Sequence, residues 1–356
     1  MTNDRLKKLR DEMSLRNLEA LLITNPINRR YIAGFTGTSG YVLVTSDHAW
    51  FLTDFRYMDQ AAKQAVGFDI VEHLPKPMES IKDLLNGVRI EKVAFEQNDL
   101  TYGSYLGYAA DLSGIELVPS SGLVEKLRMY KEDGEIVIMQ EAADLADKTF
   151  SHILTCLKPG MTEKEVALEM EFFMRRNGAT SPSFETIIAT GERSALPHGV
   201  ASDRVIQGDE FVKMDFGAYY NGYCSDLTRT VVLGKPTDKH KEIYQIVLDA
   251  QLHCLENLKP GMTGREGDAL ARDIIVKAGY GDRFGHGTGH GLGMEIHEDP
   301  RLSKLCETVL EPGMVVTVEP GIYLPGFGGV RIEDDVLITE KGIRILTRST
   351  KAFLTI

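Results

Sequence analysis

Leu157-Lys-Pro-Gly-Met-Thr162 recurs as Leu258-Lys-Pro-Gly-Met-Thr263, an offset of 101 residues. At the same offset Glu165 matches Glu266 and Gly178 matches Gly279, so the register holds without a gap through a whole predicted helix. In each copy a turn ends at a threonine that can cap a helix, and a glycine closes that helix. We interpret the recurrence as a structural duplication.

The duplication leads to two pairs of acids. The first copy contains FVKMDFGAYY (211–220) and the second VVTVEPGIYL (315–324), and their glycines align Asp215 with Glu319. A second acid follows each segment, Asp226 in GYCSDLTRT and Glu333 in GVRIEDDV. We therefore predict that strands of the two halves bring four carboxylates together across a pseudo-twofold axis.

Four buried carboxylates cannot all stay ionised side by side without cations, because desolvation and repulsion raise their pKa values. Two divalent ions would neutralise the set. One nitrogen ligand is expected from FGHGTGHGLGMEIHEDP (284–300), where Gly287 and Gly289 favour a loop around His286 and His290. The run lacks the HExxH pattern, and it lacks the strand-to-helix context and lysine of a phosphate-binding loop.

Such an oxygen-rich site with one imidazole favours manganese, with iron(II), cobalt or zinc also possible. A metal pair of this kind would hold a bridging water, lower its pKa and polarise a carbonyl group. The sequence therefore indicates a dinuclear hydrolase.

The first part of the chain has a different pattern. Short β-rich runs alternate with helical ones up to about residue 125, which predicts an α/β domain over 1–126. Strands are expected at 19–24, 41–47, 49–54, 68–73, 92–97 and 115–120, and helices at the N-terminus (Leu6, Leu9 and Met13 on one face), 56–65, 78–87 and 101–112. A helix at 131–156 opens the second, α+β domain, 127–356.

Bulk composition limits the partners. The net charge of −12 argues against nucleic-acid binding, since phosphate recognition needs a basic face. No run of 18 apolar residues occurs, so we expect no membrane association. The four cysteines are scattered without a CxxC pair, which is typical of a reducing cytoplasm.

In the segments that carry the predicted ligands, the chain resembles the pita-bread metallopeptidases of the M24 type, specifically the aminopeptidase P and prolidase branch that cleaves Xaa-Pro bonds. The matching segments are LPHG (196–199), MDFGAYYNGYCSDLTRT (214–230), HGTGHGLGMEIHE (286–298), TVEPGIY (317–323) and GVRIEDD (329–335). RYIAGFTGTSGYVLVT (30–45) and WFLTDFRY (50–57) resemble the creatinase/prolidase-type N-terminal domain.

The resemblance implies a role for each site residue. Asp226 and Glu333 would bridge two metals, Asp215 would complete one of them, and His290 and Glu319 the other. Glu319 would also exchange protons with the bridging water and the leaving nitrogen.

Five further residues receive roles from the resemblance. His297 would bind the carbonyl oxygen as negative charge develops, and His198 would help to bind substrate. His286 would line the pocket, while Arg331 and Tyr323 would hold the ligand side chains in place without binding a metal themselves. The resemblance also implies a homodimer and a proline-containing peptide or dipeptide as substrate.

Three alternatives remain open on the sequence. A methionine aminopeptidase would share the metal set but not the long N-terminal α/β region. A creatinase-like amidinohydrolase would share both domains but work without metal, and a non-catalytic binding module would have lost ligands. The sequence also leaves open whether the substrate is a dipeptide or a longer peptide.

Overall fold

The computed structural model describes residues 2–356, whose contacts divide the chain into two compact units, Met1–Arg128 and Met129–Ile356. None of the helices formed by residues 2–356 has the length and hydropathy that a membrane span requires.

The first unit is built on one six-stranded mixed sheet in the order β4-β3-β2-β1-β5-β6. Its strands are β1 (Ala20–Ile23), β2 (Tyr41–Thr45), β3 (Ala49–Thr53), β4 (Asp69–Glu72), β5 (Lys92–Glu96) and β6 (Glu116–Ser120). All six lie within the predicted ranges. The central strand β1 is buried along its whole length, so both faces of the sheet are covered.

Helices of the first unit are α1 (Thr2–Leu15), α2 (Pro26–Ala33), α3 (Met58–Gln64), α4 (Pro77–Gly87), α5 (Tyr102–Asp111) and α6 (Leu123–Met129). The apolar side chains predicted to share one face of α1, Leu6, Leu9 and Met13, are buried. Helix α2 was not predicted, although its start has clear signals: the Asn25 side chain caps it and Pro26 occupies its first turn.

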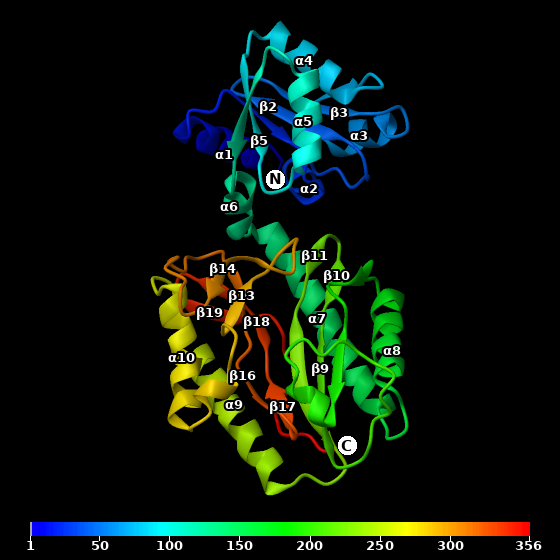
Figure 1. The fold of residues 1–356 in the computed structure, drawn as a ribbon, viewed down its shortest axis with the longest axis vertical. Helices are drawn as coiled ribbons and strands as arrows, with labels where there is room; N and C mark the ends of the chain where they lie inside the picture. The colour runs from blue at the N-terminus through cyan, green and yellow to red at the C-terminus, as the bar shows by residue number, and fades with distance from the viewer. Residues whose placement is uncertain (1) are drawn as a thin grey trace. The chain divides into compact units, whose positions relative to one another are not determined.

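Two pairs of helices frame the second unit. The first pair is α7 (Asp133–Cys156) with α8 (Glu163–Arg176), and the second is α9 (Asp238–Asn257) with α10 (Gly264–Lys277). Thr162 and Glu165 form a capping box at the start of α8, and Thr263 and Glu266 form the same box at α10. In Figure 1 the two pairs flank opposite sides of the strands of this unit.

The strands between the helix pairs form several small antiparallel sheets. One has the order β12-β9-β8 and a five-stranded one has the order β14-β13-β15-β18-β19, while β16 pairs with β17 and β10 lies between β11 and β7. The bounds are β7 (Ser181–Pro182), β8 (Ile187–Thr190), β9 (Glu210–Phe216), β10 (Ala218–Tyr220), β11 (Tyr223–Cys224), β12 (Leu227–Leu233), β13 (Gly289–Gly291), β14 (Glu298–Leu302), β15 (Val315–Val318), β16 (Gly321–Leu324), β17 (Gly328–Arg331), β18 (Asp334–Thr339) and β19 (Gly342–Ile345). Short 3-10 turns lie at Gly191–Ala195 and Gly281–Arg283.

Apolar side chains of these strands pack against the helices in two clusters. One cluster joins α7 and α8 to β9 and β12, and the other joins α9 and α10 to β15 and β18. The helices therefore bury the outer faces of the strands and leave the ends of β9, β13 and β15 to carry polar groups.

Candidate metal centre

Antiparallel pairing of β9 with β12 presents the first two acids. Asp215 lies near the end of β9 opposite Thr228, and Asp226 immediately precedes β12. Both carboxylates are buried, with exposed fractions of 6% and 4%. Desolvation of these two groups is therefore part of the cost of forming the strand pair.

Three other segments carry the remaining predicted ligands. His290 is the middle residue of β13, Glu319 follows β15, and Glu333 lies between β17 and β18. The backbone N–H of Glu333 donates to the carbonyl oxygen of Thr228 at 3.1 Å, which ties this acid to β12. A hydrogen bond thus brings the acids of the two sequence repeats side by side.

The loop predicted around His290 is a short strand instead. The reason is close packing: a Cβ atom on Gly289 would lie 1.9 Å from the carbonyl oxygen of Thr317. The glycine was taken as a sign of a loop, but here it allows β13 to approach the neighbouring backbone. His286 does lie outside the strands and helices.

The predicted ligands converge. One potential ligand atom from each of Asp226, His290 and Glu333 lies within 4.8 Å of the others, and all three residues are buried. His290 Nε2 is 3.6 Å from Asp226 Oδ2 and 3.4 Å from Glu319 Oε1. Asp215 lines the same cavity, of about 640 Å³, and its carboxylate pairs with Arg331.

The protonation of His290 is fixed by its own backbone. Its Nδ1 lies 3.0 Å from the carbonyl oxygen of Gly291, and since a carbonyl only accepts, Nδ1 carries the proton. The lone pair of Nε2 then points toward Asp226 and Glu319. Burial lowers the pKa of His290 to about 3, so the ring is neutral and suited to ligate a cation.

The carboxylates destabilise one another. Burial, followed by repulsion from Glu333 and Asp215, raises the pKa of Asp226 well above its usual value. Burial and repulsion from Glu319 do the same for Glu333. Burial also raises the pKa of Glu319 to about 7. Without a cation, Glu319 would therefore be partly protonated near neutral pH.

These residues fit divalent cations. Asp226 Oδ1 is buried and has no hydrogen-bond partner among the described residues. A buried oxygen of this kind is costly unless a proton or a metal compensates it. Carboxylate oxygens with one imidazole form a donor set that suits manganese, iron, cobalt or zinc.

The predicted supporting residues form one chain of hydrogen bonds. Arg331 Nη1 donates to the Tyr323 hydroxyl at 2.7 Å. This hydroxyl lies 2.7 Å from His286 Nε2, while His286 Nδ1 faces the carbonyl oxygen of Gly287. Nδ1 therefore donates, Nε2 accepts from the tyrosine, and the imidazole lining the cavity is held in one tautomer. Burial lowers the pKa of His286 to about 3.

His198 and His297 line the same cavity and are more exposed than the buried ligands. The ring of His297 lies 4.4 Å from that of His290, nearly perpendicular to it. His198 lies on a loop that a buried carboxylate anchors: Glu163 accepts hydrogen bonds from Thr190 and from Ser202, at 2.6–3.0 Å.

Several residues of the site were not predicted from the sequence. Lys213 is fully buried on β9 and its ammonium donates to the carbonyl oxygen of Leu196, two residues before His198. Thr228 Oγ1 donates to Glu333 Oε2 at 2.5 Å. Arg301 lines the cavity from β14. The strand patterns around these residues were visible, but only tertiary contacts show what they touch.

Family models match both units of the chain. Residues 137–340 match metallopeptidase family M24, and residues 5–130 match the creatinase/prolidase N-terminal domain. The chain therefore belongs to metallopeptidase family M24 and is a member with a creatinase/prolidase-type N-terminal domain.

Individual relatives agree with this membership over the whole chain. A Xaa-Pro dipeptidase of Pyrococcus furiosus is 43% identical, covering 99% of each chain. The structure of a Xaa-Pro dipeptidase from Bacillus anthracis has a TM-score of 0.98 and 53% identity, covering 100% of both chains. An X-Pro aminopeptidase structure from Thermotoga maritima has a TM-score of 0.92 and 36% identity, covering 97% of this chain and 100% of the other.

The raised carboxyl pKa values predict how metal affinity depends on pH. A cation entering the site must displace the proton that Glu319 holds at and below a pH of about 7, so affinity should fall as pH falls from about 7, by up to about tenfold per pH unit, and the raised pKa values of Asp226 and Glu333 act in the same direction. His290 adds nothing in this range, because its pKa of about 3 leaves it neutral. Calorimetric titration with Mn²⁺ in buffers of different ionisation enthalpy measures this release. A pH-independent affinity would contradict the assignment.

Proposed function

We propose that this metallopeptidase hydrolyses Xaa-Pro bonds at the cavity around His290, using two divalent metal ions. The observation that carries the proposal is the set of buried carboxylates facing the neutral imidazole of His290 in one substrate-sized cavity. The names of the relatives support proline as the residue after the cleaved bond. An Xaa-Pro bond lacks an N–H, so the enzyme must recognise the pyrrolidine ring instead.

In this proposal Asp215, Asp226, His290, Glu319 and Glu333 would hold the two metal ions. Bound ions would supply Lewis-acid activation of water and of the scissile carbonyl. Thr228 orients Glu333 through its hydroxyl, and Arg331 orients Asp215 through their ion pair. Manganese is the proposed metal, because the donor set is rich in oxygen.

Proton transfer is assigned to Glu319. Its pKa, raised to about 7, is close to neutral pH, where a carboxylate both accepts and returns a proton readily. Glu319 would take a proton from the attacking water and deliver it to the proline nitrogen as the C–N bond breaks. His297 would donate a hydrogen bond to the carbonyl oxygen as its charge develops, and His198 would hold the substrate.

The two LKPGMT copies support a duplicated, pseudo-twofold catalytic domain. Their helices α8 and α10 each have 14 residues and the same capping box. An isolated antiparallel bridge pairs each capping threonine with a valine, Thr162 with Val205 and Thr263 with Val309. Matching helices and bridges are expected when one unit is copied. The domain boundary near residue 126 belongs to the same proposal.

A dipeptide is the substrate favoured by the lining of the cavity. Arg301 lines it, and no described residue forms an ion pair with this guanidinium. In a Xaa-Pro dipeptide the proline carries the free carboxylate, next to the scissile bond. A guanidinium binds a carboxylate strongly through paired hydrogen bonds, so we assign Arg301 to this group.

Compartment and assembly complete the proposal. All four cysteines, which lie among the described residues, are free thiols, and this supports a reducing cytoplasm. A homodimer is proposed from the family resemblance alone.

Replacement of a bridging ligand tests the metal assignment. Glu333→Ala should lose metal loading and activity together, each by about 100-fold or more, because it removes a direct ligand. Metal content by mass spectrometry and turnover of Ala-Pro measure this. Glu340→Ala, at an exposed glutamate, is the control and should retain both. Full metal occupancy in Glu333→Ala would refute the assignment.

Replacement of His297, the proposed hydrogen-bond donor to the substrate's carbonyl oxygen, should separate metal binding from catalysis. His297→Ala should keep its metals and lose turnover by about 100- to 1000-fold, as expected for the loss of one donor to a developing oxyanion. His253→Ala, at an exposed histidine on α9, should behave as the unmodified enzyme. Unchanged turnover in His297→Ala would remove this residue from the mechanism.

A peptide panel tests the substrate class. The Mn-loaded enzyme should cleave Ala-Pro better than Ala-Pro-Ala, leave Met-Ala and creatine unchanged, and lose activity on chelation. Arg301→Ala should raise KM for Ala-Pro by about 10- to 100-fold, matching the loss of a charged hydrogen bond, and leave the KM of Ala-Pro amide unchanged. Cleavage of longer peptides in preference to Ala-Pro would instead indicate an Xaa-Pro aminopeptidase.

A further inference from the structure

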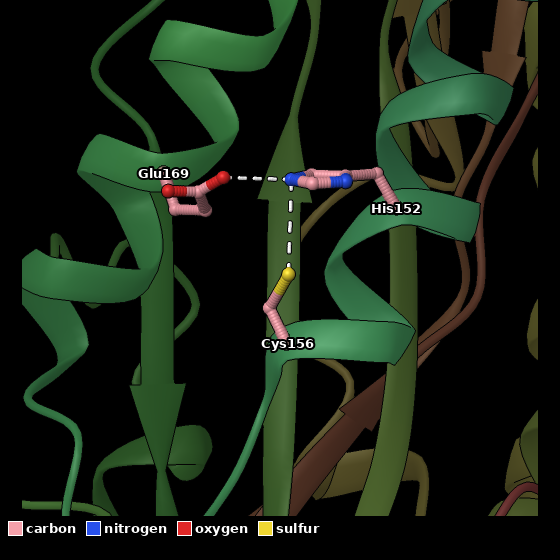
Figure 2. Close-up of side chains that lie close together, drawn as sticks. All are labelled: His152, Cys156 and Glu169. Carbon is pink, nitrogen blue, oxygen red and sulfur yellow. Dashed lines mark hydrogen bonds and ion pairs between the residues drawn. The ribbon is translucent and has the colours of Figure 1, made fainter.

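A second group of potential ligands lies away from the cavity, on the helix pair α7 and α8. His152 and Cys156 are four residues apart, on the same face of α7, and Glu169 comes from α8 (Figure 2). His152 Nε2 is 2.7 Å from Glu169 Oε1 and 3.8 Å from Cys156 Sγ. One ligand atom of each residue lies within 4.8 Å of the other two.

The geometry excludes a relay of the kind used by nucleophilic cysteines. In such a relay one imidazole nitrogen faces the thiol and the other faces the carboxylate. Here the same atom, His152 Nε2, faces both partners, as Figure 2 shows. The three donor atoms therefore lie close enough together to bind one cation.

The distances are close to those of a tetrahedral zinc site. Tetrahedral ligand bonds of about 2.3 Å to sulfur and about 2.0 Å to nitrogen place those two atoms about 3.5 Å apart, near the observed 3.8 Å between Sγ and Nε2. The carboxylate must move back by about 0.6 Å to reach a tetrahedral spacing from the nitrogen. Glu169 can do so, because 42% of its side chain is exposed.

The ring is oriented and the group is accessible. His152 stacks on Phe173, with ring centroids 4.3 Å apart and planes 14° from parallel. Cys156 and Glu169 line a surface hollow together with Leu168 and Phe172. A cation can therefore enter from solvent, and a water molecule can fill the fourth position.

The second helix pair, α9 and α10, does not contain the same three ligands at the equivalent positions. At the offset of 101 residues, the positions of His152, Cys156 and Glu169 hold His253, Asn257 and Leu270. His253 and Leu270 line a hollow between α9 and α10, so the hollow recurs. The thiol and the carboxylate do not recur, and only the first pair offers three ligands.

We propose that His152, Cys156 and Glu169 bind one zinc-class divalent ion, with water as the fourth ligand. The mixed sulfur, nitrogen and oxygen set favours a softer metal than the oxygen-rich catalytic centre does. The bound ion links the last turn of α7 to the middle of α8. The site is independent of the proposed hydrolysis.

Cobalt substitution tests the proposal by a signal that the catalytic centre does not give. Co²⁺ bound to a thiolate has a near-ultraviolet charge-transfer band, and none of the five proposed catalytic ligands contains sulfur. The metal-free full-length protein titrated with Co²⁺ alone should develop this band, and Zn²⁺ should displace it. Cys156→Ser should abolish the band, and Glu169→Gln should weaken binding by at least about tenfold.

Cys306→Ser, at a partly buried cysteine outside the group, is the matched control and should keep the band. Zinc content should be one ion per chain lower in Cys156→Ser than in Cys306→Ser, with Ala-Pro hydrolysis equal in the two. No band in the unmodified protein, or a band that persists in Cys156→Ser, would overturn the proposal. If the unmodified protein shows the band but does not hydrolyse Ala-Pro, the result would count against the proposed function and not against the zinc-class site.

Discussion

Repulsion among desolvated carboxylates is the constraint on which the rest of the second unit depends. Asp226 and Glu333 are almost fully buried, and burial raises the pKa of both; repulsion from Glu333 adds to the shift of Asp226, and repulsion from Glu319 adds to that of Glu333. A protein keeps such groups together only if cations, protons or basic side chains compensate them. Arg331 supplies part of the compensation through its ion pair with Asp215. The hydroxyl of Thr228, which donates to Glu333, and the pairing of β9 with β12 help to hold these acids in place against their repulsion.

The same constraint made much of the site predictable from sequence. Two acids on each repeated segment, with apolar runs before them, already indicated a buried cluster. In the structure, Asp215, Asp226, Glu319 and Glu333 line one cavity with His290. The repeat also predicted the capped helices α8 and α10, because a capping box depends only on residues within four consecutive positions.

Other features depend on contacts between distant segments, which no local pattern contains. Gly289 was taken as a loop signal, although its role is to let β13 approach Thr317. Nothing in the sequence around Arg301 distinguishes it from a surface arginine. Its place in the lining of the cavity is seen only in the structure. The spacing of His152 and Cys156 was visible, but Glu169 joins them only when α8 packs against α7.

The His198 loop is fixed to the strands as well as to Glu163. Glu163, which is fully buried, holds the two ends of the loop, and the ammonium of Lys213 on β9 donates to the carbonyl oxygen of Leu196 between them. Strand β9 also carries Asp215, so one strand positions both a proposed metal ligand and the loop of the proposed substrate-binding histidine. A substitution that displaces β9 would therefore change the metal centre and substrate binding together.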